Sequence, residues 1–219
     1  MRREPPELLL AVVGASAPTA VVCEPTSAAV VLGSTQDESE IDPDRCARAG
    51  LDVLRRRSGG GAVVVRPGAQ LWVDVFVPRH DPRFVEDVLA SFAFLGEAWR
   101  AALATSLDAD PSSLAVVEGG AIVKTPWSRT LCFAGLGAGE VTFHGRKIVG
   151  ISQRRERAGA WFHSMAMLEF DPFELPGLLR RAESDRLAAA RLLESTAAAV
   201  PGGRNAGPPL RSALLHALG

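Results

Sequence analysis

The segment RRRSGGGAVVV, Arg55 to Val65, places three glycines between an arginine run and a β-branched apolar segment. Glycine admits positive φ angles and lets a ligand lie against the main chain. Flanking arginines can hold a carboxylate or a phosphate through paired hydrogen bonds. The block therefore indicates a site for an activated acyl group. On composition alone, a surface turn beside a solvated basic run is the better supported alternative, because the spacing fits neither a Walker loop nor a dinucleotide fingerprint.

A second block, HGRKIVGISQRRERAGAWFHSMAMLEFD, runs from His144 to Asp171. Together the two blocks resemble the lipoate-protein ligase A family, which also contains octanoyltransferases and is related to biotin protein ligases. Members carry an Arg-Arg-x-Ser/Thr-Gly-Gly motif, then a Lys-Ile/Val-x-Gly-Ser-Ala-Gln motif and a His-Gly-containing strand. The positions that the resemblance assigns to the site are Arg56, Ser58, Gly59, Gly60, Gly61, Ala62, Lys147, Gly150, Ser152, Gln153 and His163.

This resemblance implies an enzyme that joins an octanoyl or lipoyl group to a lysine of a lipoyl domain, on a 2-oxoacid dehydrogenase or a glycine-cleavage protein. An acyl carrier protein is the candidate donor. A medium-length acyl chain needs an apolar slot, and its carbonyl needs a positive donor where negative charge develops. Lys147 is expected to be that donor. Without the family match, it would be interpreted as an ordinary exposed lysine beside Arg146.

Some octanoyltransferases of the family place an acyl-accepting cysteine upstream of the motif lysine, and Cys132 lies fifteen residues before Lys147. A thiolate can take an acyl group from a thioester and pass it to an amine. Lys147 or His163 would supply the positive charge that favours the thiolate. The alternative is that Cys132 is a small buried hydrophobe on a strand. Cys23 and Cys46 are interpreted as structural.

Three functions remain open. The favoured one is an octanoyltransferase that forms a Cys132 thioester and needs no cofactor. The second is a lipoate-protein ligase that uses ATP and magnesium and forms an acyl-adenylate. The third is a non-catalytic lipoate-binding module. Fewer than fifty residues follow Asp171, which is too short for the accessory domain of two-domain ligases and favours the transferase.

The sequence departs from the family pattern at four places. Val65 and Arg66 replace a His-Asp-like pair, Ile151 replaces a small residue and Ser164 replaces a glycine. No Asn-x-Ala-x-Asp-Glu-like helix precedes Leu8. The branched side chain of Ile151 is expected to narrow the acyl slot. Each departure is consistent with an altered acyl length, a different carrier or lost activity.

The elements that must position these residues predict an α+β domain with a mixed, largely antiparallel sheet flanked by helices, of the biotin/lipoate ligase type. Expected strands are Leu8–Val13, Ala28–Leu32, Val53–Arg56, Ala62–Val65, Leu71–Val77, Ala115–Val117, Lys147–Gln153 and Trp161–Phe170. A helix is expected from Arg83 to about Ser106, with Asp81-Pro82 at its start. The catalytic domain is placed at residues 1–175. Residues 176–219 are expected to be a helical tail with a PGGRNAGPP linker at Pro201–Pro209.

Composition limits the partners. A chain of 219 residues with 47% hydrophobic residues can bury a core, and its net charge of −1 supplies no field that would attract nucleic acid or a membrane. The run Arg154–Arg157 either docks an acidic partner or is a solvated loop. The four histidines have no ligand spacing, so no metal site is expected. An odd count of three cysteines fits a reducing cytoplasm.

Overall fold

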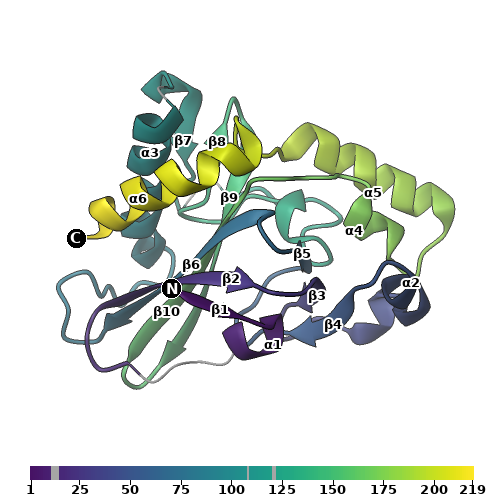
Figure 1. Ribbon diagram of the computed structural model, residues 1–219, viewed down its shortest axis with the longest axis horizontal. Helices are drawn as coiled ribbons and strands as arrows, with labels where there is room; N and C mark the ends of the chain where they lie inside the picture. Colours follow the sequence, from purple (N-terminus) through teal and green to yellow (C-terminus); the bar gives the residue numbers. More distant parts are fainter. Residues whose placement is uncertain (11–14, 108, 120–121) are drawn as a thin grey trace.

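The computed structural model describes residues 1–10, 15–107, 109–119 and 122–219. Within these residues, the larger sheet has seven strands in the order β1-β2-β6-β10-β9-β8-β7 (Figure 1). The strands are β1 (Arg2–Glu4), β2 (Thr19–Pro25), β6 (Gln70–Pro78), β10 (Gly159–Met167), β9 (Arg146–Glu156), β8 (Val141–Phe143) and β7 (Leu114–Val116). Strands β1 and β2 are parallel, and the other neighbours are antiparallel. The expected mixed, largely antiparallel sheet is confirmed.

A second, three-stranded sheet lies against part of the first. Its strands β3 (Ala29–Leu32), β4 (Asp52–Arg55) and β5 (Val63–Val65) are ordered β4-β3-β5. Val31 and Val65 of this sheet pack with Trp72 of β6 in one buried apolar cluster. The space between the two sheets is therefore lined by branched aliphatic side chains, which is the environment an acyl chain requires.

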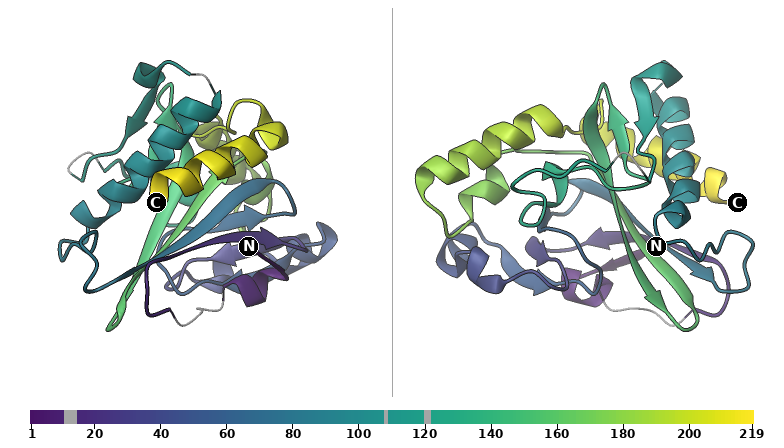
Figure 2. Two further views of the ribbon diagram at one scale, coloured as in Figure 1. Left: turned by 60° about the vertical axis from the view of Figure 1, so that its left-hand side comes forward. Right: turned by 180° about the vertical axis from the view of Figure 1, so that it is seen from behind.

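Helices cover the edges and one face of the larger sheet. The helices are α1 (Pro6–Leu9), α2 (Pro43–Arg48), α3 (Ala93–Leu107), α4 (Glu174–Gly177), α5 (Glu183–Thr196) and α6 (Gly207–Leu218). Short 3₁₀ turns are η1 (Glu38–Glu40), η2 (Ala90–Phe92), η3 (Pro111–Ser113), η4 (Cys132–Ala134) and η5 (Gly203–Ala206). Helices α3 and α6 lie side by side at one end, and α4 and α5 lie at the other end (Figures 1 and 2). Trp99 of α3 and Leu214 of α6 are fully buried in the core cluster that they form with the sheet.

Two predictions near the start of the chain and before α3 were wrong. The expected strand Leu8–Val13 begins with residues of the short helix α1, and Ala11, Val12 and Val13 lie outside the described residues. Strand β2 was not anticipated. The expected helix from Arg83 starts only at Ala93, after the turn η2.

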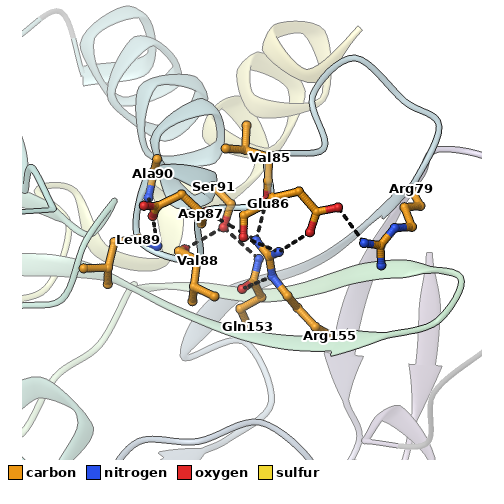
Figure 3. Close-up of polar contacts among 10 residues, drawn as sticks. All are labelled: Arg79, Val85, Glu86, Asp87, Val88, Leu89, Ala90, Ser91, Gln153 and Arg155. Atoms are coloured by element: carbon orange, nitrogen blue, oxygen red, sulfur yellow. Dashed lines mark hydrogen bonds and ion pairs between the residues drawn. The ribbon is translucent and has the colours of Figure 1, made fainter.

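The late start of α3 has a physical cause in strand β9. The Arg155 guanidinium donates to the carbonyls of Val85 and Glu86 at 2.6 and 2.8 Å (Figure 3). These two oxygens therefore accept from a side chain and not from the backbone amides of a helix. The Asp87 carboxylate then accepts from the backbone amides of Leu89 and Ala90, at the start of η2. Helical periodicity in the sequence continued through this segment, but side-chain bonds from a distant strand overrode it.

The C-terminal segment also differs from expectation. The stretch predicted to be a linker forms η5 and the first turn of α6, where Pro208 and Pro209 occupy positions that need no backbone donor. Leu210 and Leu214 have 0% exposure and pack in the cluster that includes α3. The segment is ordered because its apolar face is buried against the core. The local composition, rich in proline and glycine, does not reveal this contact.

Candidate active site

The glycine block lies directly against the segment that carries Cys132. A Cβ atom on Gly61 would lie 2.6 to 2.8 Å from main-chain atoms of Leu131 and Cys132. The Ala62 amide donates to the Thr130 carbonyl, and the Cys132 amide donates to the Ala62 carbonyl, both at 2.9 Å. Gly60 has a φ of +99°, a region that other residues rarely adopt. Bare backbone is thus needed here so that the Cys132 main chain can lie beside it.

Arg56 is a buried cation held by backbone oxygens. Its guanidinium donates to the carbonyls of Gly59 (2.7 Å), Gly61 (2.9 Å) and Val31 (3.3 Å). Among the ion pairs of the described residues, none supplies Arg56 with a carboxylate. Burial lowers the pKa of Arg56, and a negative charge on Cys132 acts against that decrease. Arg56 therefore both shapes the glycine loop and supplies unbalanced positive charge near the thiol.

A β-bulge places Lys147 on the same face as Gly150 and Ser152. Val141 of β8 pairs with Val149, while Thr142 pairs with Lys147, so Ile148 is the extra residue. Without the bulge, residues three apart on a strand would point to opposite faces. The Lys147 ammonium lies 4.8 Å from the centre of the Phe133 ring, and a Cβ on Gly150 would be 3.4 Å from the same ring.

The ammonium of Lys147 is paired with a carboxylate that the sequence did not reveal. Its Nζ lies 2.7 Å from Glu140 Oε1, and both side chains are almost fully buried. The same Nζ donates to the carbonyls of Cys132 (2.7 Å) and Gly135 (3.3 Å), so its three hydrogens are all directed at protein oxygens. Glu140 also accepts from the amides of Gly137 and Ile151. Burial raises the pKa of Glu140, and the ammonium counteracts that rise.

Two cavities meet at Cys132. The inner cavity, of about 50 Å³, lies between the two sheets and is lined by Leu10, Val31, Arg56, Val63, Val65, Trp72, Cys132, Phe133, Gly150, Ile151, Ser152, His163, Ser164 and Met165. The outer cavity, of about 310 Å³, is lined by Arg56, Gly59, Gly60, Gly61, Phe92, Ile122, Val123, Lys124, Ser128, Cys132, Gly135, Leu136, Gly137, Glu140, Lys147, Ile151, Ser152 and Gln153. Both include Arg56, Cys132, Ile151 and Ser152. The structure thus brings the cysteine, the lysine and the glycine loop to one place.

The other predicted site residues, Ser58, Gln153 and Ala62, lie in different surroundings. Ser58 Oγ lies 2.9 Å from Ser152 Oγ, which ties the glycine loop to β9. Gln153 lines the outer cavity, but its amide nitrogen donates to Ser91 Oγ at 2.9 Å and its oxygen accepts from Arg155, so it positions the loop before α3 (Figure 3). Ala62 is the exception, because its side chain belongs to a separate core cluster and lines neither cavity.

His163 faces the inner cavity beside a second acid that sequence reasoning missed. Its Nδ1 lies 3.0 Å from Asp74 Oδ1, without the alignment of a good hydrogen bond. Asp74 Oδ1 also accepts from Trp72 Nε1 at 2.6 Å. A carboxylate inside the apolar run LWVDVFV was a signal that could have identified Asp74. Glu140 had no such signal, because only the β8–β9 pairing places it beside Lys147.

Three properties of the described residues concern metal binding, membrane crossing and cysteine reactivity. Among the residues placed by the structure, no group of three or more His, Cys, Asp or Glu side chains could hold a metal ion. No helix in the described segments is long and apolar enough to cross a bilayer. Cys23 and Cys46 are buried free thiols, and burial raises the pKa of each. Cys132 is partly exposed.

Comparison with known proteins identifies related sequences. Residues 6–200 match the model of the lipoyl protein ligase A/B catalytic domain. Over 143 residues, the chain is 24% identical to the octanoyltransferase LipM of Clostridioides difficile (strain 630), covering 65% of this chain and 51% of that protein. The chain therefore spans about half the length of this relative.

Solved structures share the fold. A lipoate-protein ligase A bound with ATP superposes with a TM-score of 0.66 at 21% identity, over 91% of this chain and 70% of the other. A bipartite lipoate protein ligase from Thermoplasma acidophilum, studied with its E2 lipoyl domain, gives 0.66 at 20% identity, over 91% and 69%. With a family model that covers most of its residues and an architecture shared with these ligases, the chain belongs to the lipoyl protein ligase A/B catalytic domain family.

Proposed function

We propose that this protein transfers an octanoyl or lipoyl group to a lysine of a lipoyl domain, with a thioester on Cys132 as the covalent intermediate. The observation that carries the proposal is the position of Cys132 at the junction of an apolar inner cavity and a wider outer cavity. The inner cavity suits an acyl tail, and the outer cavity gives the donor and the acceptor lysine a route to the thiol.

The reaction has two stages. The Cys132 sulfur attacks the carbonyl carbon of a donor thioester, such as an acylated carrier protein, and the donor thiol leaves. The amine of the acceptor lysine then attacks the Cys132 thioester, which forms an amide and regenerates the thiol. Negative charge develops on the acyl oxygen in both stages, so nearby donors accelerate both.

Arg56 and Lys147 are the cations beside that oxygen. Lys147 bonds the Gly135 carbonyl at 3.3 Å, its longest contact, and this is the bond that an acyl oxygen would replace. Glu140 balances the charge of Lys147, whereas Arg56 has only neutral backbone acceptors. We therefore assign the stabilisation of a Cys132 thiolate mainly to Arg56 and the stabilisation of the acyl oxygen to Lys147.

An octanoyl chain needs more room than the inner cavity offers. The inner cavity, of about 50 Å³, has room for the centres of roughly four water molecules. Met165, which is unbranched and lines this cavity, is the side chain we expect to move when the chain enters. Ile151 borders both cavities, and we expect its branched side chain to narrow the passage between them.

An ATP- and magnesium-dependent ligase is the second candidate, favoured by the size of the outer cavity. The phosphate of an acyl-adenylate would need a free cation there. Arg56 and Lys147 are already bonded to protein oxygens, which leaves Lys124 as the exposed cation among the described lining residues. This charge arrangement fits an uncharged thioester better than a nucleotide.

Intact mass after incubation with octanoyl thioester separates the candidates. The transferase predicts an octanoyl adduct that a lipoyl domain removes, that Cys132→Ser abolishes and that Cys46→Ser retains. Acylation of the lipoyl domain that requires ATP and survives Cys132→Ser would establish the ligase instead. Lipoate affinity with neither reaction would indicate a binding module.

A further inference from the structure

Phe133, the residue after the proposed nucleophile, borders two separate apolar cavities. One is the inner cavity between the two sheets. The other, here called the rear cavity, has a volume of about 40 Å³ and is lined by residues of β5, β10, α4 and α5 and by Phe170, which follows β10. Among the described lining residues, the two cavities share only Phe133 and Val63. These two residues therefore form the wall between them.

Side chains, and not a hydrogen-bonded strand, close this wall. β5 is an edge strand of the small sheet, and beyond an isolated bridge at Ala62 no other described strand pairs with its free edge. Turn η4, which carries Phe133, lies at this edge, because the Cys132 amide donates to the Ala62 carbonyl. Val63 and Met165 pack against both the apolar cluster of the inner cavity and that of the rear cavity. The two clusters are therefore continuous around the edge of β5.

Contacts on several sides hold the Phe133 ring in place. The Lys147 ammonium lies 4.8 Å from the ring centre, and the centre of the Phe170 ring lies 5.9 Å away. A Cβ on Gly150 would lie 3.4 Å from the ring, so the glycine gives the ring its space. The residue is only 4% exposed. An acyl chain on Cys132 therefore meets a fixed ring on the side of the rear cavity.

The rear cavity is the next apolar space beyond the inner cavity. Burial in apolar surroundings stabilises each methylene of an acyl tail, so a tail that outgrows the inner cavity needs further space of this kind. Leu175 and Leu193 supply it. The acidic lining residues Glu169 and Asp171 are exposed, which places their carboxylates towards solvent.

We propose that Phe133 sets the upper limit of acyl-chain length, an inference that rests on the proposed function. With the ring in place, the inner cavity receives an octanoyl tail after Met165 moves, and longer tails are excluded. With the ring removed, the rear cavity receives the end of a decanoyl or dodecanoyl tail. The rear cavity is thus a closed subsite for straight-chain fatty acyl groups.

The test compares octanoyl and dodecanoyl thioesters on Phe133→Ala, with Phe173→Ala as the matched control. Phe173 is 46% exposed and lines neither cavity. Mass spectrometry follows the rate of adduct formation on Cys132. One methylene in a hydrophobic pocket changes rates by about 10- to 200-fold, so the wild-type protein should favour octanoyl by about tenfold or more. Phe133→Ala should lower this ratio by about tenfold or more, and Phe173→Ala should leave it unchanged.

The ratio of the two rates carries the test, because loss of a ring beside Lys147 is expected to slow both donors. Phe133→Leu covers the case that Phe133→Ala fails to fold, and it should give an intermediate ratio. Adding Leu175→Phe to Phe133→Ala refills the rear cavity and should restore the preference for octanoyl. This second step distinguishes the rear cavity from any other space that loss of the ring opens.

Three results would overturn the inference alone: a wild-type protein that accepts both donors equally, a ratio within twofold of wild type in the folded Phe133 variants, or dodecanoyl transfer that Leu175→Phe leaves intact. Calorimetry of octanoate and dodecanoate binding to Cys132→Ser, with and without Phe133→Ala, tests the length limit without chemistry. If this selectivity shifts as expected while wild-type Cys132 forms no adduct, the proposed function fails and the length limit stands. An unshifted selectivity would overturn the limit.

Discussion

The buried pair of Glu140 and Lys147 allows a quantitative test. The two side chains are 6% and 2% exposed, and Nζ lies 2.7 Å from the carboxylate. Glu140→Gln keeps the shape of the side chain but leaves an ammonium buried without its counter-ion. Removing one partner of such a pair costs about 3 to 5 kcal/mol. Lys147→Met should cost a similar amount because it leaves a buried carboxylate.

The double variant separates charge pairing from packing. With both charges gone, the deficit should be about 3 kcal/mol or less, against about 6 to 10 kcal/mol for two independent losses, which gives a coupling of about 3 kcal/mol or more. Urea unfolding measures this. For a slope of about 2 kcal/mol per molar, each single variant should lower the midpoint by about 1.5 to 2.5 M.

A control comes from the exposed pair Arg100 and Glu97 on α3, whose side chains are 36% and 54% exposed. There Glu97→Gln should change stability by less than about 0.5 kcal/mol. If Glu140→Gln costs less than about 1 kcal/mol, or if the two single effects simply add, Lys147 is not held by charge pairing and the role assigned to Glu140 is refuted.

Three further predictions address the glycine loop, the acid limit and the C-terminal helix. Gly61→Ala forces the Leu131–Cys132 main chain to move, so it should lower the free energy of unfolding by about 1 to 3 kcal/mol and slow the acylation of Cys132. Gly59→Ala, which has open space around it, should change neither quantity. Equal effects of the two variants in urea unfolding and in the acylation assay would contradict this account. The Arg83 guanidinium holds the pKa of Asp81 at about 2, below its usual value of 3.8, so its stabilisation is present above pH 3.8 and is lost as the pH falls towards 2. Asp81→Asn should remove about 1 kcal/mol at neutral pH, since Arg83 is about a third exposed, and unfolding curves of the two proteins should converge in acid. Leu214→Ala should cost about 2 to 5 kcal/mol in urea, and a loss below 1 kcal/mol would mean that α6 is not docked.

Most strands were predictable because their signals are local. The runs around β3, β5, β6, β9 and β10 are rich in β-branched and aromatic residues and are bounded by turn residues, and the structure has strands there. The turn between β8 and β9 is also local, since His144 and Gly145 have the positive φ angles of a tight hairpin turn, 48° and 77°. The start of α3 was not predictable, because Arg155, far along the chain, binds the carbonyls that a helix would have used.

For the site, the sequence by itself supplied the chemical types: a thiol, a lysine, a glycine loop and a histidine in an order that matches a known family. Their geometry depends on contacts between distant segments, which no local pattern encodes. The close approach of Gly61 to the Cys132 main chain, the bulge that turns Lys147 inward, and the pairing of Lys147 with Glu140 all arise from strand register. Asp74 likewise meets His163 only because β6 and β10 pair. Tertiary structure decided these partners because a buried charge is stable only where the fold brings a counter-charge or hydrogen-bond partners to it.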